Sequence, residues 1–169
     1  MTRIIAGEAR GRTIKVPAEG TRPTADRARE GLFSSLTARW GFAGSSVLDL
    51  FAGSGALGLE AASRGAEEAV LVESSADAVK IIRHNMGVVK HPGVRVQEMK
   101  AGTYLASAPR KHFDLVLADP PYAFDEVDAL IAAIEPVLTD HAMVVIERHV
   151  DSADTVWPAG FEPTGQKLK

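Results

Sequence analysis

The feature that most constrains this chain is a regular alternation of short apolar segments with longer helical ones, which begins at Ser46. The short segments are rich in Val, Leu and Ile, as expected of strands buried on both faces of a sheet. They occupy residues 47–51, 69–73, 94–96, 113–118 and 143–146. The helical segments between them cover residues 56–64, 76–89, 101–107 and 126–138. This alternation predicts an α/β fold with a doubly wound, mostly parallel sheet.

The part of the chain before Ser46 has a different composition, rich in Gly, Arg, Pro and Thr over residues 1–30. Residues 4–5 and 13–16 predict a short β-hairpin, with Gly11 near its turn.

A helix is expected to follow this hairpin, because apolar residues recur at helical spacing. Thr24 or Asp26 is its predicted N-cap, and Ala38 lies near its predicted end. We therefore divide the chain into an N-terminal hairpin-and-helix extension, residues 1–40, and a sheet-containing domain, residues 41–169.

Charge is distributed unevenly between these parts. Residues 1–30 carry seven Lys and Arg against four Asp and Glu, a net charge of +3, although the whole chain has a net charge of −3. A basic segment on an acidic body is typical of proteins that contact a polyanion locally. A solvated basic surface without a partner is the alternative, and charge alone does not separate the two.

Composition excludes several classes of protein. The 169 residues include no cysteine, which excludes disulfide frameworks and cysteine-ligated metal sites. No apolar run reaches about 18 residues, and the N-terminus lacks a secretory signal. The five histidines do not have a zinc-ligand spacing, so no metal is expected. We expect a cytoplasmic, single-domain protein without membrane contact, and a monomer at this size.

A glycine-containing turn joins the first predicted strand of the sheet to the helix that follows it. The sequence Asp49-Leu-Phe-Ala-Gly-Ser-Gly55 contains two glycines that let the backbone pass close to a ligand. Glu73 ends the next strand 20 residues after Gly53, the separation expected of a carboxylate that binds ribose hydroxyls. No Lys-Ser or Lys-Thr pair follows the glycines, so a nucleoside cofactor is predicted rather than a triphosphate. Tight helix–sheet packing is the alternative role of the glycines.

Asp49 narrows the choice of cofactor, because a carboxylate within a buried strand is costly unless it finds a donor. It is expected to hold the glycine loop or to meet, directly or through water, the ammonium group of a methionyl moiety. This favours S-adenosylmethionine over a dinucleotide.

Asp119-Pro120-Pro121-Tyr122 follows the strand at residues 113–118 and therefore lies at the ligand-binding edge of the predicted sheet. The two prolines form a stiff corner. Such a corner suits methylation of an exocyclic amino group, whose lone pair is delocalised into its base. The Asp119 carboxylate and the Pro120 carbonyl are expected to accept the N–H groups, while Tyr122 stacks on the base. A structural turn with a core tyrosine is the alternative.

Four motifs occur together and in order: Gly7-x-x-x-Gly11-Arg12, Arg22-Pro-Thr-x-Asp-Arg-x-Arg-Glu30, Asp49 to Gly58, and Asp119-Pro-Pro-Tyr122. In this combination the chain resembles the bacterial small-subunit (16S) ribosomal RNA guanine-N2 methyltransferase D family, over about residues 2–148. The resemblance implies a Rossmann-like class I methyltransferase that uses S-adenosylmethionine and acts on a guanine N2.

The resemblance also assigns residues to roles in this chain. The cofactor is expected to contact Asp49, Phe51, Ala52, Gly53, Ser54, Gly55, Glu73, Ser74, Lys100 and Ala101. The catalytic set is Asp119, Pro120 and Tyr122. The charge of the arginine-rich arm, and not the resemblance, makes Arg10, Arg12, Arg22 and Arg27 candidates for phosphate contacts, with Thr24 near the cofactor. Two departures from the family pattern stand out. Lys100 replaces the usual Asp or Asn against the adenine amino group, and the closing strand with its Tyr-Gly pair is missing after Gln166.

Three functions therefore remain open at this point. The leading one is methylation of guanine N2 in 16S ribosomal RNA, with the small subunit or an assembly intermediate as partner. The second is methylation of adenine N6 in DNA, against which stands the lack of an inserted target-recognition domain between the glycine loop and the tetrad. The third is a non-catalytic nucleoside-binding factor in ribosome assembly, against which stands the intact tetrad.

Overall fold

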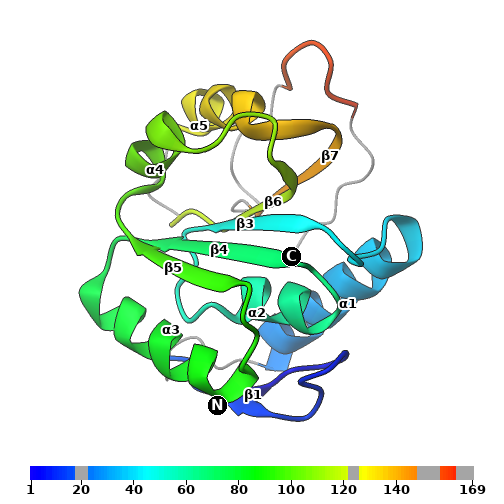
Figure 1. Ribbon diagram of the computed structural model, residues 1–169, viewed down its shortest axis with the longest axis vertical. Coiled ribbons are helices and arrows are strands. Elements are labelled where there is room, and N and C mark those ends of the chain that lie inside the picture. Colours follow the sequence, from blue (N-terminus) through cyan, green and yellow to red (C-terminus); the bar gives the residue numbers. More distant parts are fainter. Residues whose placement is uncertain (18–22, 122–125, 148–156, 163–169) are drawn as a thin grey trace.

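A computed structural model of the chain describes residues 1–17, 23–121, 126–147 and 157–162. Helices cover both faces of a parallel sheet, and a small hairpin adjoins one helical layer (Figure 1). The strands are β1 (Thr2–Arg3), β2 (Thr13–Ile14), β3 (Ser46–Leu50), β4 (Glu68–Glu73), β5 (Val94–Glu98), β6 (Phe113–Ala118) and β7 (Leu138–Ile146). The helices are α1 (Pro23–Arg39), α2 (Ala56–Ser63), α3 (Ala76–Val89), α4 (Ala101–Ser107), α5 (Val127–Ile134) and the short 3-10 helix η2 (Glu135–Val137).

The large sheet has the strand order β5-β4-β3-β6-β7, and all of its described pairings are parallel. Along the chain, the first strand of this sheet is the central strand β3. Strands β4 and β5 follow on one side of it, and β6 and β7 lie on the other side. The strand order therefore reverses beside β3, which is where open α/β sheets bind their ligands. The doubly wound parallel sheet expected from the alternating pattern is confirmed.

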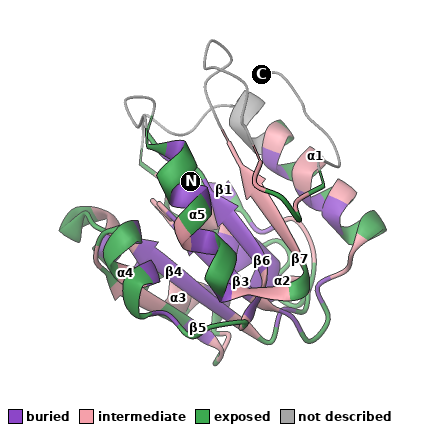
Figure 2. Cartoon of the chain, turned by 90° about the horizontal axis from the view of Figure 1, so that it is seen from above, coloured by how far each residue is buried: buried purple, intermediate pink, exposed green. Residues whose placement is uncertain are grey.

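Alternating residues of the strands face two separate hydrophobic layers. Val47, Leu71 and Leu117 pack with the layer that includes α2 and α3, while Leu48 and Val116 pack with α4 and α5. Figure 2 shows the result, with buried strands enclosed by helices whose outer faces are exposed. Because both faces are covered, the strands lack the polar alternation of a half-exposed sheet.

The N-terminal hairpin is built into the first of these layers. Ile4 and Ile14 are buried in one cluster with Phe33 of α1 and Leu59 of α2. The strand expected at residues 4–5 is instead Thr2–Arg3. The reason is tertiary, because the Ile5 amide donates to the carboxylate of Glu60 on α2 rather than to β2.

Two helix boundaries also differ from expectation. Helix α1 begins at Pro23, before both predicted caps, because proline is well suited to the first position of a helix. The helix expected over residues 126–138 is divided at Ile134, since Pro136 lacks an amide donor and the chain continues as η2. The expected absence of the closing strand after Gln166 concerns residues outside the described ranges and stays a prediction. Within those ranges, no helix has the length and apolar character needed to span a bilayer.

Candidate active site

The carboxyl ends of β3, β4 and β6 bring three predicted site residues to one level. Leu50 pairs with Val72 of β4 and with Ala118 of β6. The residues one position further along are Phe51 just after β3, Glu73 at the end of β4, and Asp119 just after β6. Sequence positions far apart thus meet beside the point where the strand order reverses.

The glycine loop leaves β3 through an unusual backbone turn. Phe51 has φ 58°, in the left-handed region that side chains other than glycine rarely adopt, and Gly53 follows with φ 59°. A Cβ atom at Gly53 would meet no heavy atom within 4 Å, whereas one at Gly55 would lie 2.8 Å from Leu71 Cδ2. Gly53 therefore faces open space suited to a ligand, and Gly55 is required for packing. Backbone strain of the kind at Phe51 is common at ligand sites.

Glu73 holds this loop through its carboxylate. The Gly53 amide donates to Oε1 at 2.8 Å, and the Ser75 amide donates to Oε2 at 2.9 Å. Each carboxylate oxygen has two lone pairs, so both oxygens can accept a further hydrogen bond from a ribose hydroxyl. The side chain is half-buried, which keeps it accessible to such a ligand.

Asp49 is the buried carboxylate of the site, with only 1% of the residue exposed. The Gly58 amide donates to its Oδ2 at 2.9 Å, but among the described residues its buried Oδ1 has no hydrogen-bond partner. Burial, opposed by the hydrogen bond from the Gly58 amide and assisted by the charges of Asp119 and Glu73, raises the pKa of Asp49 to about 7. Gly58 permits this contact, because a Cβ there would lie 2.9 Å from Leu71 Cδ1.

These features fit S-adenosylmethionine on three independent grounds. Glu73 supplies acceptors for a ribose, and Gly53 leaves space for close approach of the ligand. Asp49 supplies a buried acceptor without a donor, which a cationic methionyl group would satisfy directly or through water. An unpaired buried carboxylate oxygen is costly, so its presence is itself an argument for a ligand at this edge.

The corner after β6 is described as far as Pro121. The Asp119 amide donates to the Leu50 carbonyl at 3.5 Å, so the corner is tied to the end of β3. The Asp119 side chain is exposed, and Pro120 is buried. Tyr122 lies outside the described residues, and its stacking role stays a prediction.

Three other residues predicted to contact the cofactor differ in how far they are buried. Ser74 is exposed directly after β4, beside the glycine loop. Lys100 is exposed at the N-cap of α4, where its side chain makes no capping bond. Ala101 is buried in the hydrophobic layer with α4 and α5, so only its backbone is suited to a polar contact.

The predicted RNA-contacting residues do not all gather at this edge. Arg10 and Arg27 are exposed. Arg12 Nη1 donates to the carbonyls of Val88 and Val89, at 3.2 and 2.9 Å, and thereby caps the C-terminus of α3. This end of α3 is about 20 Å from its N-terminus at the cofactor edge. Arg22 and the side chain of Thr24 lie outside the described part, so their roles stay predictions.

Polar residues on α2 that the motif analysis missed hold the hairpin in place. Glu60 accepts hydrogen bonds from the amides of Ile5 and Ala6, at 2.9 and 3.1 Å. Ser63 Oγ accepts from the Ala9 amide at 2.9 Å. Glu60 and Ser63 are buried, and the signal that could have found them is two polar residues within the apolar stretch of residues 59–63.

A metal-dependent site has no support in the described ranges, where no group of three or more His, Asp and Glu is placed to hold an ion. His112 instead bonds to Glu68, and His91 Nδ1 accepts from the Gly93 amide at 2.9 Å.

The parallel sheet with a glycine loop and acidic residues where its strand order reverses defines a class I methyltransferase. The fold is shared with the solved structure of precorrin-6y C5,15-methyltransferase from Geobacter metallireducens, with a TM-score of 0.64 and 20% identity over 79% of this chain and 66% of that chain.

Sequence comparison narrows this class to a family. The chain belongs to the family described as Conserved hypothetical protein 95, whose model matches residues 2–168. It is 36% identical to ribosomal RNA small subunit methyltransferase D of Escherichia coli K12, over 98% of this chain and 84% of that protein. The solved structure of Escherichia coli yhhF matches with a TM-score of 0.86 and 35% identity, over 99% of this chain and 92% of that chain. The family membership and the methyltransferase class inferred from the motifs are confirmed.

Proposed function

We propose that this protein transfers a methyl group from S-adenosylmethionine to the exocyclic N2 of a guanine in 16S ribosomal RNA. The observation that carries the proposal is the meeting of Asp49, Glu73 and Asp119 at one edge of the sheet, in a chain 36% identical to a ribosomal RNA small subunit methyltransferase. The fold and family support S-adenosylmethionine as the cofactor in general terms. The roles of individual residues rest on the geometry described above.

In this proposal the cofactor lies across the glycine loop. Glu73 accepts hydrogen bonds from the ribose hydroxyls, and Gly53 allows close backbone approach. Asp49 favours the cationic methionyl end, because a positive charge nearby stabilises its ionised form. When bound, S-adenosylmethionine supplies an electrophilic methyl carbon on a positively charged sulfur.

Asp119 and Pro120 orient the guanine. The N2 lone pair is delocalised into the ring, so N2 is a weak nucleophile until its N–H groups are held by acceptors. The Asp119 carboxylate and the Pro120 carbonyl provide two such acceptors, and Tyr122 stacks on the base. Holding two reactants in line contributes up to about 7–11 kcal/mol. The proton lost from N2 leaves after transfer, so Asp119 does not need to be a strong base.

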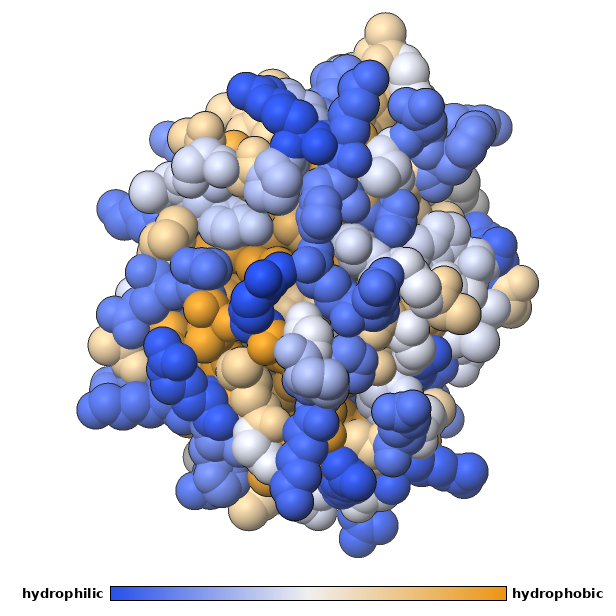
Figure 3. Space-filling view, in the orientation of Figure 1, coloured by the Kyte–Doolittle hydropathy of each residue, from blue (hydrophilic) through white to orange (hydrophobic). Residues whose placement is uncertain are grey.

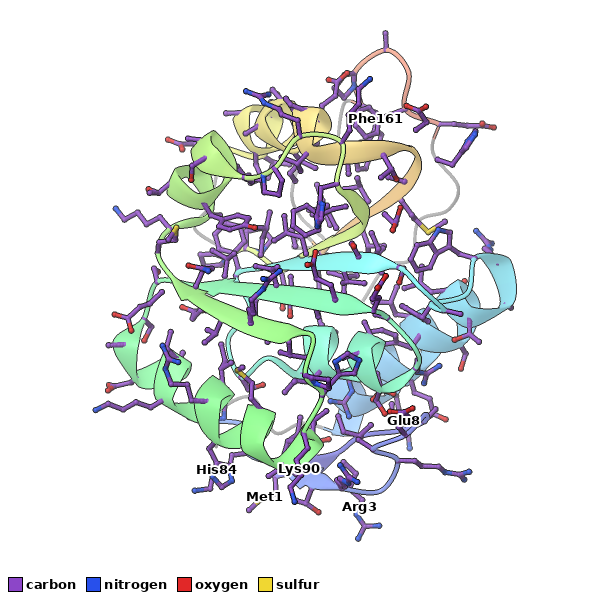
Figure 4. All side chains as sticks on the ribbon, viewed as in Figure 1. Met1, Arg3, Glu8, His84, Lys90 and Phe161 are labelled. Atoms are coloured by element: carbon purple, nitrogen blue, oxygen red, sulfur yellow. The ribbon has the colours of Figure 1, made fainter. Side chains whose placement is uncertain are left out.

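The base must be unstacked to reach this corner, and phosphate contacts elsewhere on the surface position its strand. Arg10 and Arg27 are exposed and suited to such contacts. Figure 4 shows Arg3 and Lys90 at the same end of the molecule as the hairpin, and Figure 3 shows that this end is largely hydrophilic. Arg12 belongs to the same end, although its guanidinium also caps α3.

The test is transfer of a radiolabelled methyl group to three substrates: small ribosomal subunits lacking the modification, naked 16S ribosomal RNA, and DNA. We expect N2-methylguanosine in one of the first two. N6-methyladenine in DNA would replace the proposal with the second function considered above. Binding of S-adenosylhomocysteine without transfer to any substrate would favour a non-catalytic assembly factor.

The contribution of the basic hairpin has its own test. The double variant Arg10→Ala/Arg12→Ala is expected to weaken RNA binding and flatten its salt dependence, because fewer counterions are released. An unchanged salt slope would remove these residues from the RNA-binding surface.

A further inference from the structure

Asn85 on α3 is the only asparagine of the chain, and its side chain is completely buried, with 0% exposure. It bonds to two segments that are far apart in the sequence. The Lys15 amide donates to Asn85 Oδ1 at 2.8 Å, and Asn85 Nδ2 donates to the Lys15 carbonyl at 2.8 Å. Nδ2 also donates to the Ser54 carbonyl, in the middle of the glycine loop, at 2.9 Å. One side chain thus joins the end of the hairpin to the loop assigned to the cofactor.

An asparagine amide is well matched to this position. Its carbonyl and amino groups pair with Lys15 as a peptide group pairs in a sheet, and the second N–H reaches Ser54. Both donors are therefore used, as expected for a buried amide. Aspartate has the same shape but would place an oxygen against two carbonyls.

The glycine loop is held between two supports. The Glu73 carboxylate accepts from the Gly53 amide, and Asn85 donates to the adjacent Ser54 carbonyl. Helix α3 also packs close to Gly55, where an added Cβ would lie 3.4 Å from Ile82 Cγ1. Any ligand that orders this loop also restricts the Ser54 carbonyl, and with it Asn85.

The other hairpin anchors are different in kind. Glu60 and Ser63 bond to residues 5–9, and Arg12 bonds to the end of α3. None of these contacts between described residues involves the glycine loop. Within the described residues, Asn85 is the side chain that bonds to both segments.

We infer that Asn85 is a positioning residue that links cofactor binding to the N-terminal basic segment. Cofactor binding at the glycine loop stabilises the Lys15 contact, and RNA binding to the basic segment stabilises the loop in return, since such coupling is reciprocal. This inference rests on the proposed function for its two ligands. Its physical content is a single hydrogen-bond network through one buried amide.

Hydrogen exchange of the unmodified protein tests the first half of the linkage, with S-adenosylhomocysteine as the probe. Ligand binding raises the protection of every amide that exchanges by global unfolding. The Lys15 amide is therefore compared with the Ala9 amide, which bonds to Ser63 instead. We expect the protection of Lys15 to rise about fivefold or more relative to Ala9, the lower range of typical coupling. Equal changes at both amides would overturn the inference.

A matched pair of variants tests the second half. Asn85→Asp keeps the side-chain volume but removes both donated bonds, while Ser63→Ala loosens the hairpin without touching the glycine loop. The measured quantity is the ratio of RNA dissociation constants without and with S-adenosylhomocysteine. We expect a ratio of about fivefold in the parent protein and in Ser63→Ala, and a ratio near one in Asn85→Asp.

The outcomes separate this inference from the proposed function. A parent protein that methylates RNA but shows no effect of S-adenosylhomocysteine on RNA affinity would overturn the linkage and leave the function intact. Equal ratios in Asn85→Asp and the parent protein would do the same. If Asn85→Asp does not fold, the hydrogen-exchange comparison decides the question without it.

Discussion

The two edges of the parallel sheet both carry carboxylates, but they differ in how those carboxylates are bonded. At the amino edge, Glu68 pairs with Arg95 at 2.6 Å and with His112. Asp114 accepts from the Ser46 amide and the Thr139 hydroxyl, both at 2.9 Å. At the carboxyl edge, one buried oxygen of Asp49 finds no partner in the part of the chain that the structure describes, and the pKa of Asp49 is raised to about 7.

The difference shows that a cavity alone indicates a ligand site less well than a buried polar atom whose hydrogen-bonding capacity is unused. A hollow of about 360 Å³ opens at the amino edge, lined in part by Ser46, Glu68 and His112. Glu68 in this lining already bonds to both Arg95 and His112, so little is gained by adding a ligand there. The carboxyl edge carries the unsatisfied charge, and a ligand there would recover the cost of burying it.

The largest effect on the rate is expected at the carboxyl end of β6, and the amino end of the same strand provides the control. Asp119→Ala should lower the rate of methyl transfer by about 10²-fold or more, because one of the two acceptors for the N2 hydrogens is lost. Its matched control is Asp114→Ala at the opposite end of the strand, which should reduce stability and leave the rate within about threefold. Single-turnover methyl transfer at saturating cofactor measures both. Full turnover by Asp119→Ala would remove the proposed role of this carboxylate.

The two ends of β4 provide the next comparison. Glu73→Ala should weaken binding of S-adenosylhomocysteine by about 10–100-fold, because hydrogen bonds to a charged group contribute about 1.5–3 kcal/mol. Glu68→Ala, on the same strand at the amino edge, should leave this affinity unchanged. Isothermal titration calorimetry measures both constants. Similar losses in the two variants would contradict the assignment of the ribose to the carboxyl edge.

Asp49 allows a comparison across pH. Its pKa in the folded protein, about 7, lies above the ordinary aspartate value of 3.8. The folded state therefore binds an extra proton between these values, and Asp49 makes the free energy of unfolding fall as pH rises from about 4 to about 7. Asp49→Asn removes this dependence, so the ligand-free variant should gain about 2–3 kcal/mol relative to the parent protein between pH 5 and pH 8, since pH 5 lies about two units below the raised pKa.

Urea denaturation of both proteins at pH 5 and pH 8 measures this difference. The same substitution should weaken S-adenosylhomocysteine binding, because asparagine lacks the negative charge that attracts the ammonium group of the ligand. A stability difference that does not change with pH would show that Asp49 is ionised throughout this range.

The smallest effect is expected at the paired amino edge. Arg95→Ala removes the ion pair with Glu68, but the arginine side chain is 61% exposed, and such pairs contribute about 0–1 kcal/mol. Thermal unfolding should change little, and both cofactor affinity and methyl transfer should stay at the parent values. A large loss of activity would mean that the two edges are not functionally distinct.

The sequence alone was sufficient for the elements whose signals are local. Strand β6 at residues 113–118 and helix α3 at residues 76–89 have the predicted bounds. A short continuous apolar run indicates a strand buried on both faces, and helical periodicity indicates a helix with one buried face. The glycine loop and Glu73 were found in the same way, since their 20-residue separation follows from the dimensions of one strand–helix–strand unit.

Only the tertiary structure decided how the N-terminal segment is attached and what Arg12, Glu60 and Asn85 do. The bonds made by Asn85 and Glu60 to the hairpin span 70 and 55 residues, and Arg12 bonds to a carbonyl 77 residues away. A local pattern cannot contain such a pairing, because the partner is set by how whole helices pack. Burial then gives these polar side chains their importance, since each must find its hydrogen bonds wherever the fold supplies them.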